Sequence, residues 1–391
     1  MSEKDDMALS VYGKGSVSDF LDDLIVYRGL NPCDPRLPSY AVSASAIGLQ
    51  KGRLPRKHED SYARLVVYLL EAAQSLTRPA SKVKRLIYLG DTRLSDVTAF
   101  RNLCTAGSWD GLAFICSEDK KRPAELFKEG ADDGSSLFRH VYSANRWSLL
   151  SEFNEQSQYL DFRADEETVV VIDLDKTAIG ARGRNAGVID QARQLAVQVT
   201  VADLLGDAFK LPVFLEAYGA LNQPEFHFFT EDNQDYLAYV CLAIASGRYR
   251  LEEVVEKIRS GRLVSFHEFI SEVDSHSSEL PDGLDALHAG FYAYLQAGDP
   301  TPFKAFRRNE YHLTASRMGW LPDDASLKKI LSEEIVITSE VHRAALKWKS
   351  EGALIFGLSD KPDEASLPDP EQVSRGCLPL HRIKSHIVGA K

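Results

Sequence analysis

The sequence predicts an α/β fold in which a parallel sheet is interrupted by a long helical insert. Three short apolar runs, each followed by a polar turn and a helical pattern, lead to this prediction: RLIYLGD at 85–91, GLAFICSED at 111–119 and TVVVIDLD at 168–175. Short buried strands that alternate with helices are typical of a parallel sheet with crossover helices. The same texture returns in EEIVITSEVHRAALKWKSEGALIFGLSDKP at 333–362.

The stretch between these two regions has a different texture. Residues 186–332 are largely helical in pattern and contain few strand-like runs. An insert of roughly 150 residues is within the usual size of a domain. The predicted division is an N-terminal extension with helices (1–80), a first part of the core (81–182), a helical insert (183–332) and a second part of the core (333–391).

Composition narrows the class of protein. The 391 residues are 44% hydrophobic and 26% charged, which is ordinary for a globular protein, and the net charge of −11 argues against a general nucleic-acid-binding role. Five scattered cysteines without a CxxC pair predict reduced thiols and a cytoplasmic protein. MSEKDDMALS does not resemble a signal peptide, and the apolar runs are shorter than a membrane span, so we expect no membrane association.

The run VVVIDLDKT at 169–177 ends in two aspartates. In a parallel sheet, residues just beyond the carboxyl ends of the strands line the binding crevice. Asp173 and Asp175 are two residues apart, so they point to one side of an extended chain. Two close carboxylates repel each other unless a cation or a proton separates them, which indicates Mg²⁺ chemistry or acid/base chemistry.

Three other apolar runs also end in polar residues suited to phosphate chemistry. Asp91 ends RLIYLGD, and Asp96 follows five residues later, where further metal ligands are useful. Thr338 ends EEIVIT and offers a hydroxyl to a phosphoryl oxygen. Lys361 follows ALIFGLSD and offers a cation that stabilises clustered negative charge.

Taken together, these segments resemble the haloacid dehalogenase superfamily of phosphohydrolases. VVVIDLDKT is similar to the first motif of that family, DxDx[TV], and VIT at 336–338 to the second. SDKP at 359–362 is similar to the third motif, and GDTRLSD at 90–96 to the fourth. The resemblance covers roughly residues 81–180 and 331–391. Because the fourth motif precedes the first, it implies that the strands of the family occur in circularly permuted order.

Two motif assignments have alternatives. Asp360 or Asp363 could supply the fourth motif in place of GDTRLSD, but only about twenty residues separate them from Thr338, too few for the missing strand and its crossover. Lys57 could supply the lysine of the third motif. Lys361 is favoured because SDKP directly follows an apolar run.

The resemblance implies a Rossmann-like core with the helical insert as a cap, and a Mg²⁺-dependent phosphatase that forms an aspartyl-phosphate. Asp173 is the implied nucleophile and Asp175 the implied general acid and base. Thr338 and Lys361 are the implied phosphate-binding residues. The implied metal ligands are Asp173, Asp175, Asp91 and Asp96.

The expected substrate is a small phosphorylated molecule. Arginines bind phosphate or carboxylate bidentately, so two clusters near the catalytic turn and in the insert are candidate substrate contacts. These residues are Arg182, Arg184, Asn185, Arg307 and Arg308. A phosphotransferase with the same intermediate and a non-catalytic binding or regulatory protein are the alternative functions.

Overall fold

The computed structural model describes residues 8–49, 54–129, 138–206, 210–231, 233–280 and 283–391. The chain forms two compact units. The first contains the segments up to Lys51, Pro55–Ala192 and Thr314–Lys391, and the second consists mainly of Arg193–Leu313. The expected helical insert (183–332) therefore contains the main segment of the second unit.

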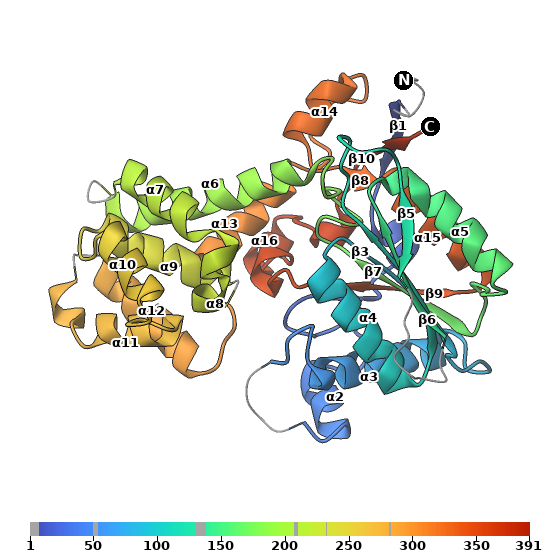
Figure 1. The fold of residues 1–391 in the computed structure, drawn as a ribbon, viewed down its shortest axis with the longest axis horizontal. Coiled ribbons are helices and arrows are strands. Elements are labelled where there is room, and N and C mark those ends of the chain that lie inside the picture. The colour runs from blue at the N-terminus through green and yellow to red at the C-terminus, as the bar shows by residue number, and fades with distance from the viewer. Residues whose placement is uncertain (1–7, 50–53, 130–137, 207–209, 232, 281–282) are drawn as a thin grey trace. The chain divides into compact units, whose positions relative to one another are not determined.

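A seven-stranded sheet forms the centre of the first unit (Figure 1). Neighbouring strands are parallel except for β5, which pairs antiparallel with β6. In spatial order the strands are β2 (Ile25–Val26), β9 (Leu354–Leu358), β7 (Thr168–Asp173), β3 (Arg85–Gly90), β4 (Asp110–Cys116), β6 (Arg139–Ala144) and β5 (Leu126–Glu129). The predicted α/β fold is confirmed.

Helices cover both faces of this sheet, which explains why its central strands are apolar along their whole length. Ala113 of β4 packs into the cluster formed by α3 (Asp60–Thr77) and α4 (Arg93–Gly107), whereas the next residue, Phe114, contacts Phe153 of α5 on the other face. The helices of that second face are α5 (Leu150–Tyr159) and α15 (Ser339–Glu351). Strands buried on both faces cannot show the alternating pattern of a half-exposed sheet.

A second, three-stranded sheet joins the two ends of the chain. It has the order β1 (Leu9–Gly15), β10 (Ser385–Ala390) and β8 (Ile337–Thr338). Leu9 pairs with Ala390, so the first and last strands lie side by side (Figure 1). The run EEIVIT was expected to supply a strand of the main sheet, but its strand β8 belongs to this small sheet.

The first 80 residues also contribute to the core of the first unit, beyond the predicted extension with helices. β2 forms an edge of the main sheet, and Ile25 and Val26 are fully buried. A two-residue strand is too short to show periodicity in the sequence, which explains why it was not predicted. The remaining short helices of the first unit are α1 (Ser18–Leu21), α2 (Tyr40–Ala46), α14 (Leu327–Glu333) and α16 (Pro370–Ser374).

The second unit is helical. Its central helix is α9 (Gln234–Ala245), in which every residue from Asp235 onward is buried. The buried carboxylate of Asp235 accepts hydrogen bonds from Arg307 and from the main chain of Phe303, so its charge is compensated. The surrounding helices are α6 (Ala186–Leu205), α7 (Leu211–Leu221), α8 (His227–Thr230), α10 (Leu251–Arg259), α11 (Phe266–Asp274), α12 (Leu284–Gln296) and α13 (Lys304–Ala315), of which α6 and α13 continue into the first unit.

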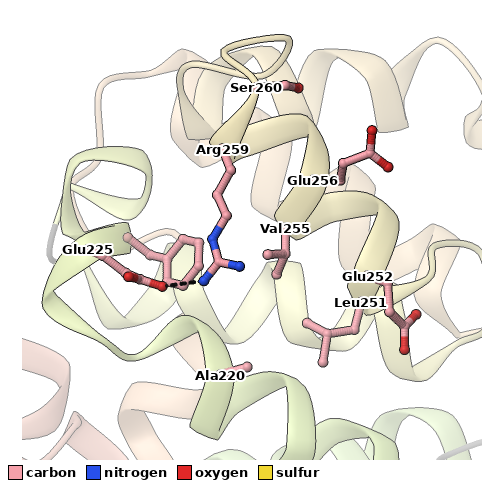
Figure 2. Close-up of a pocket in the computed structure, with 9 residues that line it drawn as sticks. Ala220, Glu225, Leu251, Glu252, Val255, Glu256, Arg259 and Ser260 are labelled. Atoms are coloured by element: carbon pink, nitrogen blue, oxygen red, sulfur yellow. Dashed lines mark hydrogen bonds and ion pairs between the residues drawn. The ribbon is translucent and has the colours of Figure 1, made fainter.

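An open pocket of about 760 Å³ lies within the second unit, between α7 and α10 (Figure 2). Phe226, Leu251 and Val255 give it an apolar floor, and Arg259 forms an ion pair with Glu225 at its side. It contains none of the predicted catalytic residues. Across the described ranges, no helix is both long enough and apolar enough to cross a lipid bilayer.

Glu334 directly follows α14, and its side chain is hydrogen-bonded to β10 of the small sheet. Its carboxylate is buried and accepts hydrogen bonds from Ser385 Oγ at 2.8 Å and from the main chain of His386 at 3.0 Å. Burial by itself raises the pKa of Glu334, but the hydrogen bonds from His386, Ser385 and Leu321 bring it below its usual value. A carboxyl group with a lowered folded pKa stabilises the fold above its unfolded pKa, and this stabilisation is lost as pH falls through the folded pKa.

We therefore expect Glu334→Gln to reduce the free energy of unfolding by about 1–3 kcal/mol at pH 7, because an ionised acceptor of several hydrogen bonds is replaced by an amide. The difference from the unsubstituted protein should narrow as pH falls through the lowered pKa of Glu334, because its carboxylate then becomes protonated. Urea unfolding at pH 7, 5 and 3.5 measures the difference in the free energy of unfolding and its change with pH. A difference that grows toward low pH would contradict this account.

Candidate active site

The carboxyl ends of three adjacent strands bring the acidic residues together. Asp173 ends β7 and pairs in register with Leu358 of β9, so Ser359 follows at the same edge of the sheet. On the other side of β7, Leu89 of β3 pairs with Ile172, which places Asp91 two residues further along at this edge. Asp91 and Asp173 are both nearly buried, with 7% and 6% of their surface exposed.

Lys57 is the cation at the centre of this cluster. Its ammonium lies 2.8 Å from Asp173 Oδ1 and 2.6 Å from Asp96 Oδ1, and the side chain is buried. Burial alone would lower the pKa of Lys57, but Asp173 and Asp96 raise it well above its usual value. The ammonium therefore stays charged. Of the two lysines considered for the third motif, Lys57 is the one that the structure pairs with Asp173.

Both carboxylate oxygens of Asp96 accept hydrogen bonds from other groups of the protein. Oδ1 accepts hydrogen bonds from Lys57 and from the hydroxyl of Tyr88, and Oδ2 accepts the main-chain N–H groups of Asp91 at 3.0 Å and Thr92 at 2.8 Å. A Cβ added at Gly90 would come within 2.6 Å of this carboxyl group, so glycine is needed there. Asp96 thus holds the turn at 90–92 and orients Asp91, although it was predicted as a metal ligand.

Asp91 pairs with an arginine from the loop after β7. Its Oδ2 accepts a hydrogen bond from Arg182 Nε, and Arg182 Nη2 lies 3.3 Å from Thr92 Oγ1. Burial and then Asp96 raise the pKa of Asp91. Burial also raises the pKa of Asp173 well above its usual range, and Asp96 and Asp91 add to this while Lys57 opposes it.

Burial is the main cause of these raised pKa values, and repulsion among the carboxylates adds to it, while Lys57 and Arg182 offset only part of the increase. Among the described residues, no three acidic, histidine or cysteine side chains already form a complete metal site. Mg²⁺ needs no such set, since it is usually held by one or two carboxylates and completes its octahedron with water. The oxygen donors and charge of Asp173 and Asp91 therefore fit a hard divalent cation.

The loop after β7 turns sharply and carries Asp175. The main-chain N–H of Ala178 donates to the carbonyl of Asp173 at 3.2 Å, and that of Arg182 donates to the carbonyl of Lys176 at 2.8 Å. Lys176 has a φ of +65°, in the left-handed region. The half-buried Asp175 thus lies on a rigid turn, two residues from the proposed nucleophile.

A hydroxyl at this edge comes from Ser359. Ser359 is buried directly after β9, and its Oγ accepts the main-chain N–H of Lys361 at 3.2 Å, so its own proton can be donated to a ligand. The predicted Thr338 lies in the small sheet, where its hydroxyl donates to the carbonyl of Thr177 at 2.6 Å. Ser359 was missed, although a hydroxyl directly after the apolar run LIFGL signals its position.

The alternative acidic residues lie on the segment after β9. Asp363 Oδ1 accepts the main-chain N–H of Gly29 at 2.8 Å, and Asp360 is exposed. Neither carboxylate is hydrogen-bonded to Lys57, in contrast to Asp96. Lys361 is also on this segment; its side chain is buried and its carbonyl accepts the main-chain N–H of Arg28.

Most of the candidate substrate contacts serve the fold. Arg184 is buried between Glu118 and Glu340, at 2.7 and 3.0 Å. Asn185 bonds to the main chain of 331–336. In the second unit Arg307 is buried in the ion pair with Asp235, and Arg308 is exposed on α13. Arg182 is the member of this set that lies at the acidic cluster.

No protein-family model matches the chain, and no match was found among curated proteins or solved structures. The function is therefore inferred from the residues of the site and their geometry. Fold-level likeness alone would in any case say little about chemistry, because one fold supports many reactions.

Gly183 is needed for the loop that carries Arg182. Its φ is +78°, and an added Cβ would lie 2.0 Å from the carbonyl oxygen of Glu118. We expect Gly183→Ala to reduce the free energy of unfolding by about 2–4 kcal/mol, because both the left-handed backbone and the backbone contact oppose a side chain.

Gly187→Ala is the matched control, since Gly187 lies in α6 and its Cβ would contact nothing within 4 Å. That change should stabilise the protein by about 0.5–1 kcal/mol. Urea unfolding of both variants measures the contrast, and equal effects would contradict the close approach at Gly183.

Proposed function

We propose that this protein is a Mg²⁺-dependent phosphatase of the haloacid dehalogenase type, which hydrolyses a phosphomonoester through an aspartyl-phosphate. The observation that carries the proposal is the buried Lys57, which bridges Asp173 at the end of β7 and Asp96 in the first turn of α4. Under the proposal, Lys57 takes the role of the third-motif lysine, for which Lys361 was the favoured choice, next to the first-motif Asp173 and the fourth-motif Asp96. Under this proposal the helical insert is the cap that excludes water and selects the substrate.

The reaction assigns a separate task to each aspartate. A carboxylate oxygen of Asp173 attacks phosphorus and forms the aspartyl-phosphate, while the P–O bond to the leaving group breaks and Asp175 donates a proton to the departing oxygen. Asp175 then removes a proton from a water molecule that attacks the same phosphorus. The P–O bond to Asp173 breaks, and inorganic phosphate and the free carboxylate are released.

The other residues position the reactants and balance charge. Lys57 holds Asp173 by an ion pair and offsets the repulsion between this carboxylate and an incoming phosphate. Ser359 can donate its hydroxyl to a phosphoryl oxygen next to Asp173. Asp96 fixes both Lys57 and the turn that presents Asp91.

Asp173, Asp91 and the main-chain carbonyl of Asp175 would hold Mg²⁺. When bound, the cation neutralises charge on the transferring phosphoryl group and on the carboxylates around it. Arg182 now compensates Asp91, so its guanidinium must share or give up this carboxylate when the metal binds.

The direct test is phosphate release from a panel of phosphomonoesters, with and without Mg²⁺. We expect activity that needs the metal and that falls by at least about 10³-fold in Asp173→Asn, because an amide is not a competent nucleophile. Glu152→Gln, an exposed change on α5, is the control and should keep full activity. Activity that survives Asp173→Asn or chelation would overturn the mechanism.

Two pairs of variants test the roles of the lysines and hydroxyls. Lys57→Met should lower kcat by at least about 10²-fold, because Asp173 and Asp96 lose their shared cation, and Lys361→Met should lower it less. Likewise Ser359→Ala should reduce kcat/KM more than Thr338→Ala. Steady-state kinetics measure these ratios, and circular dichroism checks that each variant is folded. A larger loss in Lys361→Met than in Lys57→Met would assign the role of the catalytic-site cation to Lys361. A larger loss in Thr338→Ala than in Ser359→Ala would assign phosphate binding to Thr338.

A further inference from the structure

The active-site edge of the main sheet continues past β9 to the short strand β2, and Arg28 follows that strand. Val26 of β2 pairs with Leu358 of β9, which in turn pairs with Asp173 of β7. Neighbouring strands are about 4.8 Å apart, so the chain at Arg28 lies roughly 10 Å across the sheet from the nucleophile strand. Both are at the carboxyl edge, where ligands bind in parallel sheets.

Main-chain hydrogen bonds connect the segment of Arg28 to the segment that contains Ser359. The main-chain N–H of Ser359 donates to the carbonyl of Val26 at 3.0 Å, and that of Arg28 donates to the carbonyl of Lys361 at 3.2 Å. Gly29 also donates its main-chain N–H to Asp363 Oδ1, and a Cβ at Gly29 would approach the other carboxylate oxygen, Oδ2, to 2.4 Å. The position of the arginine is therefore set by the same segment that supplies the candidate phosphate-binding hydroxyl.

The guanidinium of Arg28 has a hydrogen-bond donor that the described residues leave unsatisfied. The residue is half-buried, and its Nη2 atom is buried without a hydrogen-bond partner among the residues that the structure describes. A buried donor left in this state is unfavourable, and a ligand acceptor would satisfy it. The same segment also contains the buried Lys361 side chain and the carboxylate of Asp363.

We propose that Arg28 binds a second anionic group of the substrate, at the end opposite the phosphate that is hydrolysed. The substrate class is then a phosphomonoester that carries a carboxylate or a second phosphate, both of which a guanidinium binds bidentately. This inference rests on the proposed phosphatase function and extends it to substrate selection. Arg28 has no part in the chemical steps described above.

Three matched compounds test the proposal: n-butyl phosphate, 4-(phosphonooxy)butanoate and 1,4-butanediol bisphosphate. The protein should prefer the compounds with a second anion. In Arg28→Gln the ratio of kcat/KM between these compounds and n-butyl phosphate should fall by at least about tenfold, as expected for the loss of a charge-assisted hydrogen bond. Arg28→Lys should recover part of the ratio. Arg36→Gln is the control, because Arg36 lies in the same segment but is exposed and paired with Asp34.

The outcomes separate this inference from the function on which it rests. If Arg28→Gln lowers the kcat/KM ratio only for 4-(phosphonooxy)butanoate, the second anionic group is a carboxylate. If it lowers the ratio only for 1,4-butanediol bisphosphate, the second group is a phosphate. Hydrolysis of all three compounds with an unchanged ratio would overturn the role of Arg28 and leave the phosphatase intact. If no compound is hydrolysed, calorimetry with 1,4-butanediol bisphosphate decides: binding weakened by Arg28→Gln upholds the anion site without the hydrolytic function, and no binding overturns both.

Discussion

The ion pairs of one buried ammonium organise the candidate site. Lys57 contributes the positive charge that allows Asp173 and Asp96 to be buried a few ångströms apart, since two unpaired carboxylates in that position would repel each other strongly. Asp96 in turn fixes the turn that presents Asp91. The two ion pairs of Lys57 thus connect the segment before α3 with the end of β7 and the first turn of α4.

The sheet supplies the geometry that makes this contact useful. β3, β7, β9 and β2 are adjacent and parallel, so their carboxyl ends deliver side chains from four distant parts of the sequence to one edge. Helices on both faces bury these strands completely and keep their ends rigid. This edge carries the carboxylates of Asp91 and Asp173 on β3 and β7 and, beyond β9, Arg28 after β2.

The sequence predicted what short-range patterns encode. The α/β texture, the helical insert and the aspartates that directly end apolar runs could all be recognised, because each signal spans fewer than about ten residues. Lys57 was the less favoured choice because its ion pair with Asp173 is a tertiary contact between residues 116 positions apart. Thr338 was preferred over Ser359 because a strand's own sequence does not say which sheet it joins. Arg28 follows a two-residue strand that gives no periodic signal at all.

The pairing of the first and last strands has a consequence for how the protein is made. β1 requires β10, and β2 requires β9, so both sheets join residues more than 300 positions apart. Contacts of such long sequence separation form slowly, because the intervening chain must be ordered or looped out first. During synthesis the main sheet has no complete edge at β2 until β9 has emerged, and the small sheet forms only once β10 has emerged. The helical unit, whose main segment is continuous, can form its own core earlier, so domain-wise folding would proceed from the middle of the chain outward.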